Sequence, residues 1–127
     1  MAGISPTQRT IKCQKDLNRT YGIVERFIQR PGSFGFRKDL FGWIDIISIS
    51  RAEGIIGVQS CGQGFSEHVK KIKAEPLVIT WLESGGKGEL WGWRKVKKKR
   101  GGKAMIWKAR VADIYTDGEN IQVIERK

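Results

Sequence analysis

The sequence predicts a single domain of mixed α and β structure, and three observations lead to this class. The chain has 127 residues, which is about the length of one domain and enough for one hydrophobic core. Hydrophobic residues make up 39% of it, with five Trp and five Phe, so a packed core can form. Sixteen Gly and only three Pro indicate many turns and strands rather than a helical bundle. We therefore expect residues 1–127 to form one mixed domain.

The first half of the chain reads as a helix followed by three strands. Ser5 and Pro6 are typical of an N-cap and a first helical turn, and the helix is expected to run to about Arg19. A Pro-, Gly- and Ser-rich loop is expected between the first two strands, at residues 30–39. The strand candidates are apolar and rich in Ile, and they cover residues 23–29, 43–49 and 55–60.

The second half predicts a helix and two long strands. A basic helix is expected over residues 65–74, and the segment 77–83 fits either a second helical piece or a strand. Strands are expected at residues 89–96 and 104–114, joined by a basic hairpin tip at about 97–103. The tail, at about 117–127, reads as a weak strand or a weakly ordered end. The expected order is α-β-β-β-α-(α)-β-β.

Charge is the strongest global signal in the sequence. Twenty-four Lys and Arg stand against thirteen Asp and Glu, which gives a formal net charge of +11. A field of this sign attracts polyanions and raises their association rates, so nucleic acid is the expected partner class. A basic RNA-binding protein of unrelated fold would share this property, so the charge indicates the class of partner but not the reaction.

Several other classes are not expected from the sequence. No apolar run approaches the ~20 residues of a membrane-spanning helix, and no secretion signal is expected at the N-terminus, so a cytoplasmic protein (in the host cytoplasm if phage-encoded) without membrane contact is predicted. Cys13 and Cys61 fit a reduced chain better than a disulfide scaffold. Together with the single His68 they are too few and too scattered for a structural zinc site.

Asp45 is the first candidate functional residue. It lies within the apolar segment Trp-Ile-Asp-Ile-Ile, where a buried carboxylate costs several kcal/mol unless a partner or a metal compensates it. The alternative is an Asp at a strand end that pairs with one of the many cations. The next strand favours the first interpretation. If Ala52 is the centre of a tight hairpin, Asp45 is directly opposed to Gln59 on the same side of the sheet.

At this point the sequence resembles a family. A helix, a strand, a carboxylate on one strand and an acid-x-Lys position on the next resemble the PD-(D/E)XK nucleases, including Holliday-junction resolvases. The blocks RKDLFGWID (37–45) and GVQS (57–60) are similar to a small nuclease-like group of phages and prophages. The resemblance covers roughly Ser5 to Val96. It implies a restriction-endonuclease-like core of order α-β-β-β-α-β, here with an added C-terminal strand or hairpin.

The resemblance also implies a site. Asp45 would be the central metal-binding carboxylate for Mg²⁺ or Mn²⁺, Gln59 would stand where the second acid usually is, and Cys61 where the Lys usually is. A Gln carbonyl can bind a hard cation but brings no charge, and Cys cannot replace the Lys. Other residues would then have to complete the site. For the second acid we name Glu25, which Ile23 and Phe27 on the same strand face would hold near the core, and then Asp39. For the cation we name Lys38 and then Lys70 or Lys71. The Ser60 backbone carbonyl is a further candidate ligand.

Basic residues distributed along the chain predict the nucleic-acid surface. The helix at 65–74 follows Gly62 and Gly64, so backbone N–H groups near Ser66 could approach a phosphate. The Trp residues at 91 and 93 fit a core better than a stacking platform. The tip at 97–100 cannot be buried and is the better phosphate contact. The residues expected to contact nucleic acid are Arg30, Arg37, Lys38, Ser66, Lys70, Lys71, Arg94, Lys95, Lys97, Lys98, Lys99 and Arg100.

Three hypotheses follow for function. The first is a Mg²⁺- or Mn²⁺-dependent DNA endonuclease selective for structure, such as branched or single-strand-containing DNA; a homodimer would then be required to present two symmetric sites to a junction. The second is a non-catalytic DNA-binding relative on the same fold. The third is a basic RNA-binding protein. The position of Asp45 opposite Gln59 separates the first two from the third.

Overall fold

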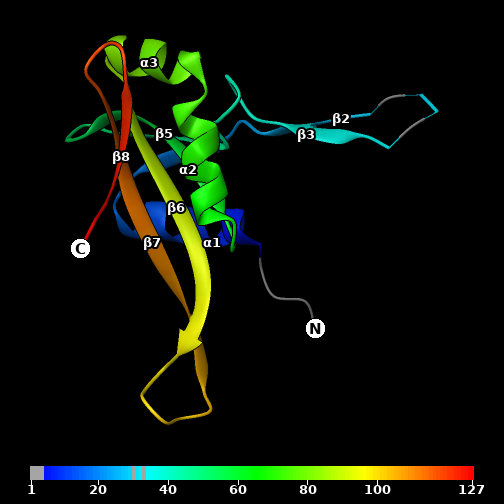
Figure 1. The fold of residues 1–127 in the computed structure, drawn as a ribbon, viewed down its shortest axis with the longest axis vertical. Helices are drawn as coiled ribbons and strands as arrows, with labels where there is room; N and C mark the ends of the chain where they lie inside the picture. The colour runs from blue at the N-terminus through cyan, green and yellow to red at the C-terminus, as the bar shows by residue number, and fades with distance from the viewer. Residues whose placement is uncertain (1–4, 30, 33) are drawn as a thin grey trace.

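A six-stranded mixed sheet forms the centre of the computed structural model, which describes residues 5–29, 31–32 and 34–127 (Figure 1). The strand order is β1-β4-β5-β6-β7-β8, and of these neighbouring pairs only β5 and β6 run parallel. The expected mixed α/β class is confirmed. The bounds are β1 Thr20–Ile23, β4 Ile46–Ser50, β5 Gly54–Cys61, β6 Lys87–Lys97, β7 Met105–Thr116 and β8 Ile121–Glu125.

Helices cover both faces of this sheet. Helix α1 (Pro6–Asp16) lies on one face, against β1, β5 and β6. Helices α2 (Phe65–Lys73) and α3 (Pro76–Glu83) form the crossover between β5 and β6 and lie on the other face (Figure 1). A parallel strand pair requires such a crossover, and this decides the open choice at residues 77–83 in favour of a helix. None of the helices in the described ranges is long and apolar enough to cross a membrane.

Helix α1 begins where the sequence predicts and ends earlier. The Ser5 hydroxyl accepts a hydrogen bond from Gln8 N, and the Gln8 side chain accepts one from Ser5 N, which completes a capping box. The predicted end near Arg19 is wrong, because Asn18 adopts the left-handed conformation with φ 58°. The chain therefore leaves the helix after Asp16 and enters β1 at Thr20.

The single strand predicted over residues 23–29 is wrong. The N–H groups of Val24 and Glu25 both donate to the Asp45 carbonyl, and the chain then turns out of the sheet. It continues as β2 (Arg26–Ile28), which pairs with β3 (Phe36–Lys38) in a separate ribbon that projects from the sheet (Figure 1). The predicted loop at 30–39 therefore contains a strand. The pairing of β2 with β3 thus replaces the continuation of β1 that the sequence predicts.

The hairpin register predicted around Ala52 is confirmed. Ile46 is paired with Val58 and Ile47 with Gly57, so the ladder points Asp45 toward Gln59. Strand β4 begins at Ile46 rather than at Trp43, since Trp43 and Ile44 belong to a turn that starts at Leu40. Both residues are fully buried nevertheless. Their apolar character reflects the core rather than a strand.

The sheet separates two hydrophobic cores, one on each of its faces. On the α1 side, Ile56, Val58, Trp91 and Trp93 pack together, so the two Trp residues are core residues as expected. On the α2 side the core contains Trp43, Phe65, Ile72, Leu90 and Ala112, among others. Because side chains alternate along β5, Gln59 and Cys61 face the α2 side. The candidate site therefore lies between the sheet and α2.

The two C-terminal strands extend the sheet as expected, with longer bounds. β6 and β7 pair antiparallel from Gly88–Ile114 to Lys97–Met105, and they continue past every other element as a long hairpin (Figure 1). The tail, which the sequence left as a weak strand or a weakly ordered end, forms β8 and pairs with β7 from Ala112 to Thr116.

Candidate metal centre

Three carboxylates meet at the start of β4. Glu25, Asp39 and Asp45 each offer an oxygen atom, and these atoms all lie within 4.8 Å of one another. Asp45 comes directly before β4, Glu25 lies between β1 and β2, and Asp39 directly follows β3. Like charges at this spacing repel strongly unless a proton or a cation lies among them. We call these three residues the carboxylate cluster.

Asp45 is the buried member of the cluster, with 2% of its surface exposed. Its Oδ2 accepts hydrogen bonds from Gln59 Nε2 at 2.7 Å and from the Ser60 N–H at 2.9 Å. Its Oδ1 is buried without a hydrogen-bond partner in the described structure, and so is Gln59 Oε1. A buried oxygen without a partner costs about 1–3 kcal/mol. Two such oxygens beside the carboxylate cluster are what a hard cation would satisfy.

The protonation of the cluster reflects this crowding. Burial raises the pKa of Asp45 to about 9, and the neighbouring Asp39 and Glu25 act in the same direction, against the Ser60 N–H. Burial acts to raise the pKa of Asp39 as well, but its interactions with the neighbouring Asp45 and with Lys71 outweigh this and hold that pKa below its usual range. Without a metal, Asp45 therefore keeps its proton at neutral pH.

Glu25 reaches the cluster for a different reason from the one predicted. The sequence placed it on a strand face between Ile23 and Phe27, held near the core by both. These two residues are 58% and 61% exposed, so they hold nothing against the core. The backbone instead positions Glu25, because its N–H donates to the Asp45 carbonyl at 3.2 Å.

Among the described residues, Lys71 on α2 contacts the cluster through Asp39. Its Nζ lies 2.9 Å from Asp39 Oδ2. Lys38, the first cation named from the sequence, is exposed on the β2–β3 ribbon. Lys70 is 3.7 Å from Glu67 on the same helix, and both of those side chains are largely exposed. The helix periodicity alone left Lys70 and Lys71 open, and the docking of α2 decides between them.

Ser60 and Cys61 follow Gln59 on β5. The Ser60 side chain points to the α1 face, where its hydroxyl lies 2.8 Å from the Thr10 hydroxyl, while its N–H binds Asp45. Binding of a metal by its carbonyl stays a prediction. Burial raises the pKa of the Cys61 thiol to about 11, and Asp45 adds to this effect. The residue at this position is thus a neutral thiol at physiological pH.

The other basic candidates lie on three surfaces. Ser66, Lys70 and Lys71 are exposed on α2, whose N-cap is Gly64. Arg94 and Lys95 are exposed on β6, and the tip residues Lys97, Lys98, Lys99 and Arg100 are exposed at the end of the β6–β7 hairpin. Arg30 and the side chain of Arg37 lie outside the described part of the chain.

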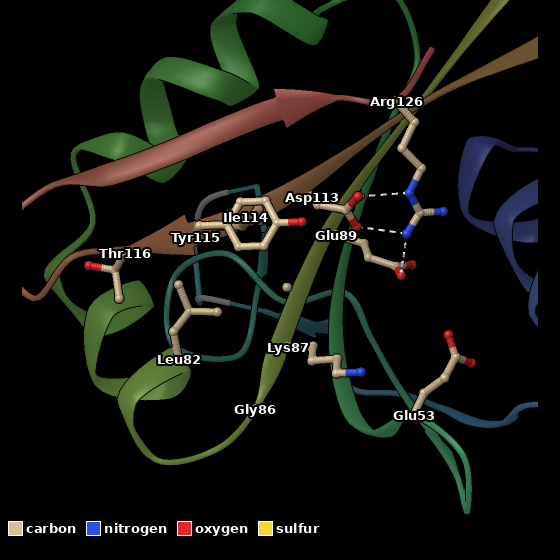
Figure 2. Close-up of a pocket in the computed structure, with 11 residues that line it drawn as sticks. Glu53, Leu82, Gly86, Lys87, Glu89, Asp113, Ile114, Tyr115, Thr116 and Arg126 are labelled. Atoms are coloured by element: carbon tan, nitrogen blue, oxygen red, sulfur yellow. Dashed lines mark hydrogen bonds and ion pairs between the residues drawn. The ribbon is translucent and has the colours of Figure 1, made fainter.

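A buried ion network on the opposite face was not predicted. Arg19, with a side chain 2% exposed, donates to both oxygens of Glu89, at 2.9 Å each, and also to Glu53 and Gln14. Arg126 binds Glu89 and Asp113 from the other side, and Figure 2 shows these three residues beside the pocket that Lys87 and Tyr115 also line. Glu89 is an acid in a mainly apolar stretch of the sequence just as Asp45 is, and that signal could have found it.

In this network the charge of the buried carboxylate is compensated by guanidinium groups. Burial alone would raise the pKa of Glu89, but the hydrogen bonds from Arg19 and Trp91 outweigh it and lower that pKa below its usual range. Arg19 thus compensates the charge that burial would penalise. The two carboxylates that are buried among the described residues differ in this respect, since Glu89 has guanidinium partners and Asp45 has further carboxylates.

Comparison with known proteins adds no family. No protein-family model, no curated protein and no solved structure matches this chain.

Proposed function

We propose that this protein is a Mg²⁺- or Mn²⁺-dependent DNA endonuclease with a restriction-endonuclease-like core. The observation that carries the proposal is the carboxylate cluster with its two buried oxygens, Asp45 Oδ1 and Gln59 Oε1, that lack a partner in the described structure. Oxygen ligands in this number and of this charge suit a hard divalent cation.

The order of the elements supports the same proposal. Helix α1 is followed by the antiparallel strands β1, β4 and β5, then by the α2–α3 crossover and the parallel strand β6. We interpret this as the α-β-β-β-α-β order that the resemblance implies, with the β2–β3 ribbon inserted and β7 and β8 added. On this interpretation, Asp45 directly before β4 and Gln59 on β5 would stand where that core carries its metal ligands.

The residues of the candidate metal centre have separate roles in the proposed hydrolysis. Asp45, Asp39, Glu25 and the Gln59 carbonyl would hold the metal, which when bound activates a water molecule and neutralises the scissile phosphate. The Gln59 and Ser60 donors orient the Asp45 carboxylate. A carboxylate of the cluster accepts the proton of the attacking water, and Glu25, less buried than Asp45, is suited to that step.

We assign to Lys71 the role of the lysine that usually stands at the position of Cys61. Cys61 offers a neutral thiol and cannot stabilise the developing negative charge on the phosphate. Lys71 reaches the cluster from helix α2, and its Nζ contacts Asp39. When a metal binds, Asp39 would bind the metal instead of Lys71. The Lys71 ammonium group is then released toward the phosphate. In this proposal the other carboxylates of the cluster replace the acid that is usual at residue 59, and Lys71 replaces the lysine that is usual at residue 61.

The first experiment tests metal binding apart from catalysis. Thermal unfolding is followed in EDTA and in Mg²⁺, Mn²⁺ or Ca²⁺, and the divalent ions should raise the Tm of the wild type. Asp45→Asn should lose this shift, while Asp16→Asn on the exposed end of α1 should keep it. An unchanged wild-type Tm at millimolar concentrations of every ion would rule out the metal site.

The second experiment tests cleavage. The protein is incubated with supercoiled plasmid and with a four-way junction in Mg²⁺, Mn²⁺ or EDTA. Metal-dependent nicking that is lost in Asp45→Asn, with DNA binding kept, supports the endonuclease. The alternative is a non-catalytic DNA-binding protein on the same fold, which the neutral Cys61 favours. Tight binding without cleavage of any substrate in either metal would establish that alternative.

A further inference from the structure

The β6–β7 hairpin extends beyond the rest of the protein as a two-stranded arm, which we define as residues 94–108 (Figure 1). Strand β5 ends at Cys61, opposite Gly92, and the β7–β8 pairing ends at Ala112, so both edges of the arm lie outside these ladders. An isolated hairpin of this kind is marginally stable in water on its own. The arm is therefore a surface that a bound partner would stabilise.

The composition of the arm identifies the chemistry of that partner. Its fifteen residues, RKVKKKRGGKAMIWK, contain eight Lys or Arg and no Asp or Glu. Arg94 lies directly opposite Lys108, and like charges in this position repel across the strands. One or two lysines would be enough to protect free strand edges from aggregation. Eight cations without an acid fit a polyanion instead.

The direction of the arm relates it to the carboxylate cluster. Arg94 and Lys108 share the sheet face of Gln59, Cys61 and Gly92, because side chains alternate along each strand. Cations on this face thus continue the line that starts at the cluster. The side chain of Arg110 lies on this face as well, but its charge is paired with Glu125 at 2.7 Å, and its guanidinium lies 4.1 Å from the centre of the Phe65 ring of α2.

The length of the arm sets the distance to its tip. Strand β6 advances from Gly92, level with Cys61, to Lys97, which at ~3.3 Å per residue is about 17 Å before the turn begins. Duplex DNA rises ~3.4 Å per base pair, so this length and the turn correspond to about five to seven base pairs. A contact at the tip is therefore well separated from one at the cluster.

A contact with α1 keeps the arm in this direction. The Arg9 guanidinium lies 4.4 Å from the centre of the Trp107 ring, on the α1 side of the sheet. Trp107 is 40% exposed, so the brace covers only part of the ring. Such a cation–π contact is a modest stabilising interaction at an exposed site. The arm is held at its base and exposed at its tip.

We propose that the β6–β7 arm lies along the DNA on one side of the carboxylate cluster and binds backbone phosphates about five to seven base pairs away. This inference rests on the proposed DNA binding and specifies its footprint. The tip residues Lys97, Lys98, Lys99 and Arg100 make the distal contacts. The arm thereby requires a minimum length of duplex on that side.

The test compares binding to duplexes of increasing length in EDTA, by fluorescence anisotropy. The tip variant changes Lys97, Lys98, Lys99 and Arg100 to Ser. The charge-matched control changes four exposed cations away from the arm to Ser, namely Lys12, Lys15, Arg51 and Lys127. The ratio of wild-type to tip-variant affinity removes the statistical effect of length. It should be near one for duplexes of about eight base pairs and rise at least tenfold by about twenty.

Salt dependence provides the second measurement. On long duplexes the tip variant should lower the slope of log K against log salt by about 3–4, since each lost phosphate contact lowers it by ~0.9. A second variant joins Val96 to Ile106 through Asn-Gly, which suits a two-residue hairpin turn, and it should behave like the tip variant. Arg9→Ala should weaken binding to long duplexes only.

The outcomes separate this inference from the proposed activity. A ratio that stays the same at every length, or a control that loses as much as the tip variant, would overturn the arm's role. Neither result depends on metal or cleavage. A protein that cuts nothing can still show the length dependence, and a metal-dependent nuclease can fail to show it. Circular dichroism melting of each variant verifies that the fold is retained.

Discussion

Gln59 donates a hydrogen bond from its Nε2 to Oδ2 of Asp45 at 2.7 Å, across the end of the β4–β5 hairpin. The amide is both a support and a candidate ligand, since it holds one carboxylate oxygen of Asp45 while its own Oε1 stays buried without a partner in the described structure. A carboxylate at this position would lose the donor and add a fourth carboxyl group to the cluster. The choice of Gln thus stabilises the cluster when no metal is bound.

Gln59→Glu should therefore make the fold depend on metal. In EDTA we expect a loss of about 1–3 kcal/mol, because a donor to a buried carboxylate is replaced by a repelling group. In Mn²⁺ the variant should recover and show a larger metal-induced Tm shift than the wild type. Thermal unfolding measures both. Gln63→Glu, in the exposed turn after β5, is the matched control and should melt like the wild type; equal melting of Gln59→Glu in EDTA would contradict the proposed geometry.

The pKa of Asp45 predicts how stability depends on pH. Because burial raises this pKa to about 9 in the folded state, the folded protein binds more protons than the unfolded chain between about pH 4 and 9. The stability of the metal-free protein should therefore fall as pH rises through this window, with a slope of at most about 1.4 kcal/mol per pH unit.

Urea unfolding between pH 5 and 9 measures this dependence. Asp39 has a lowered pKa, so its contribution lies at more acidic pH and does not reverse the trend. Asp45→Asn should show a flatter profile, since it has no proton to lose. Saturating Mn²⁺ should flatten the wild-type profile as well, because the metal takes the place of the proton. A wild-type stability that rises steadily from pH 5 to 9 in EDTA would refute the buried protonated carboxylate.

Lys71→Ala should lower cleavage more than metal binding. Its Nζ contacts Asp39 at 2.9 Å, so its loss removes the cation assigned to the phosphate while leaving the oxygen ligands in place. We expect a fall in the rate constant of about 10²–10³-fold, which is typical for one electrostatic contact to the transition state. Lys70→Ala, one residue away and exposed, is the control and should retain the rate within a few-fold. Single-turnover cleavage in Mn²⁺ measures both, and equal effects of the two variants would exclude the role of Lys71.

Arg19→Met should destabilise the fold without affecting the cluster. The substitution leaves Glu89 buried with one remaining guanidinium partner, Arg126. Breaking a buried ion pair from one side costs roughly 3 kcal/mol or more. Urea denaturation in EDTA measures this, with Arg51→Met in the exposed hairpin turn as the control. The metal-induced Tm shift should survive in Arg19→Met, and its loss would show that the network and the cluster are coupled.

Local features of the sequence predicted much of the fold. The Ser5 N-cap, the basic helix at 65–74 and the register around Ala52 depend on residues close together in the chain, and the structure has each of them. The prediction failed where two pairings competed for one segment, as at residues 23–29. It also failed where a single backbone conformation ended an element, as at Asn18.

The sequence by itself determined the strong positive charge and the position of Asp45 opposite Gln59. Both follow from composition and from the two-residue period of a hairpin, which involve no distant part of the chain. Only the tertiary structure decided that Glu25 and Asp39 join Asp45, and that Lys71, named after Lys38 in the sequence, contacts Asp39. Those residues come from the ends of β1 and β3 and from a helix on the other side of the cluster. Packing of these elements brings them together, and packing leaves no periodic pattern in the sequence. Asp45 was thus identifiable from its neighbours in the chain, and its partners only from the fold.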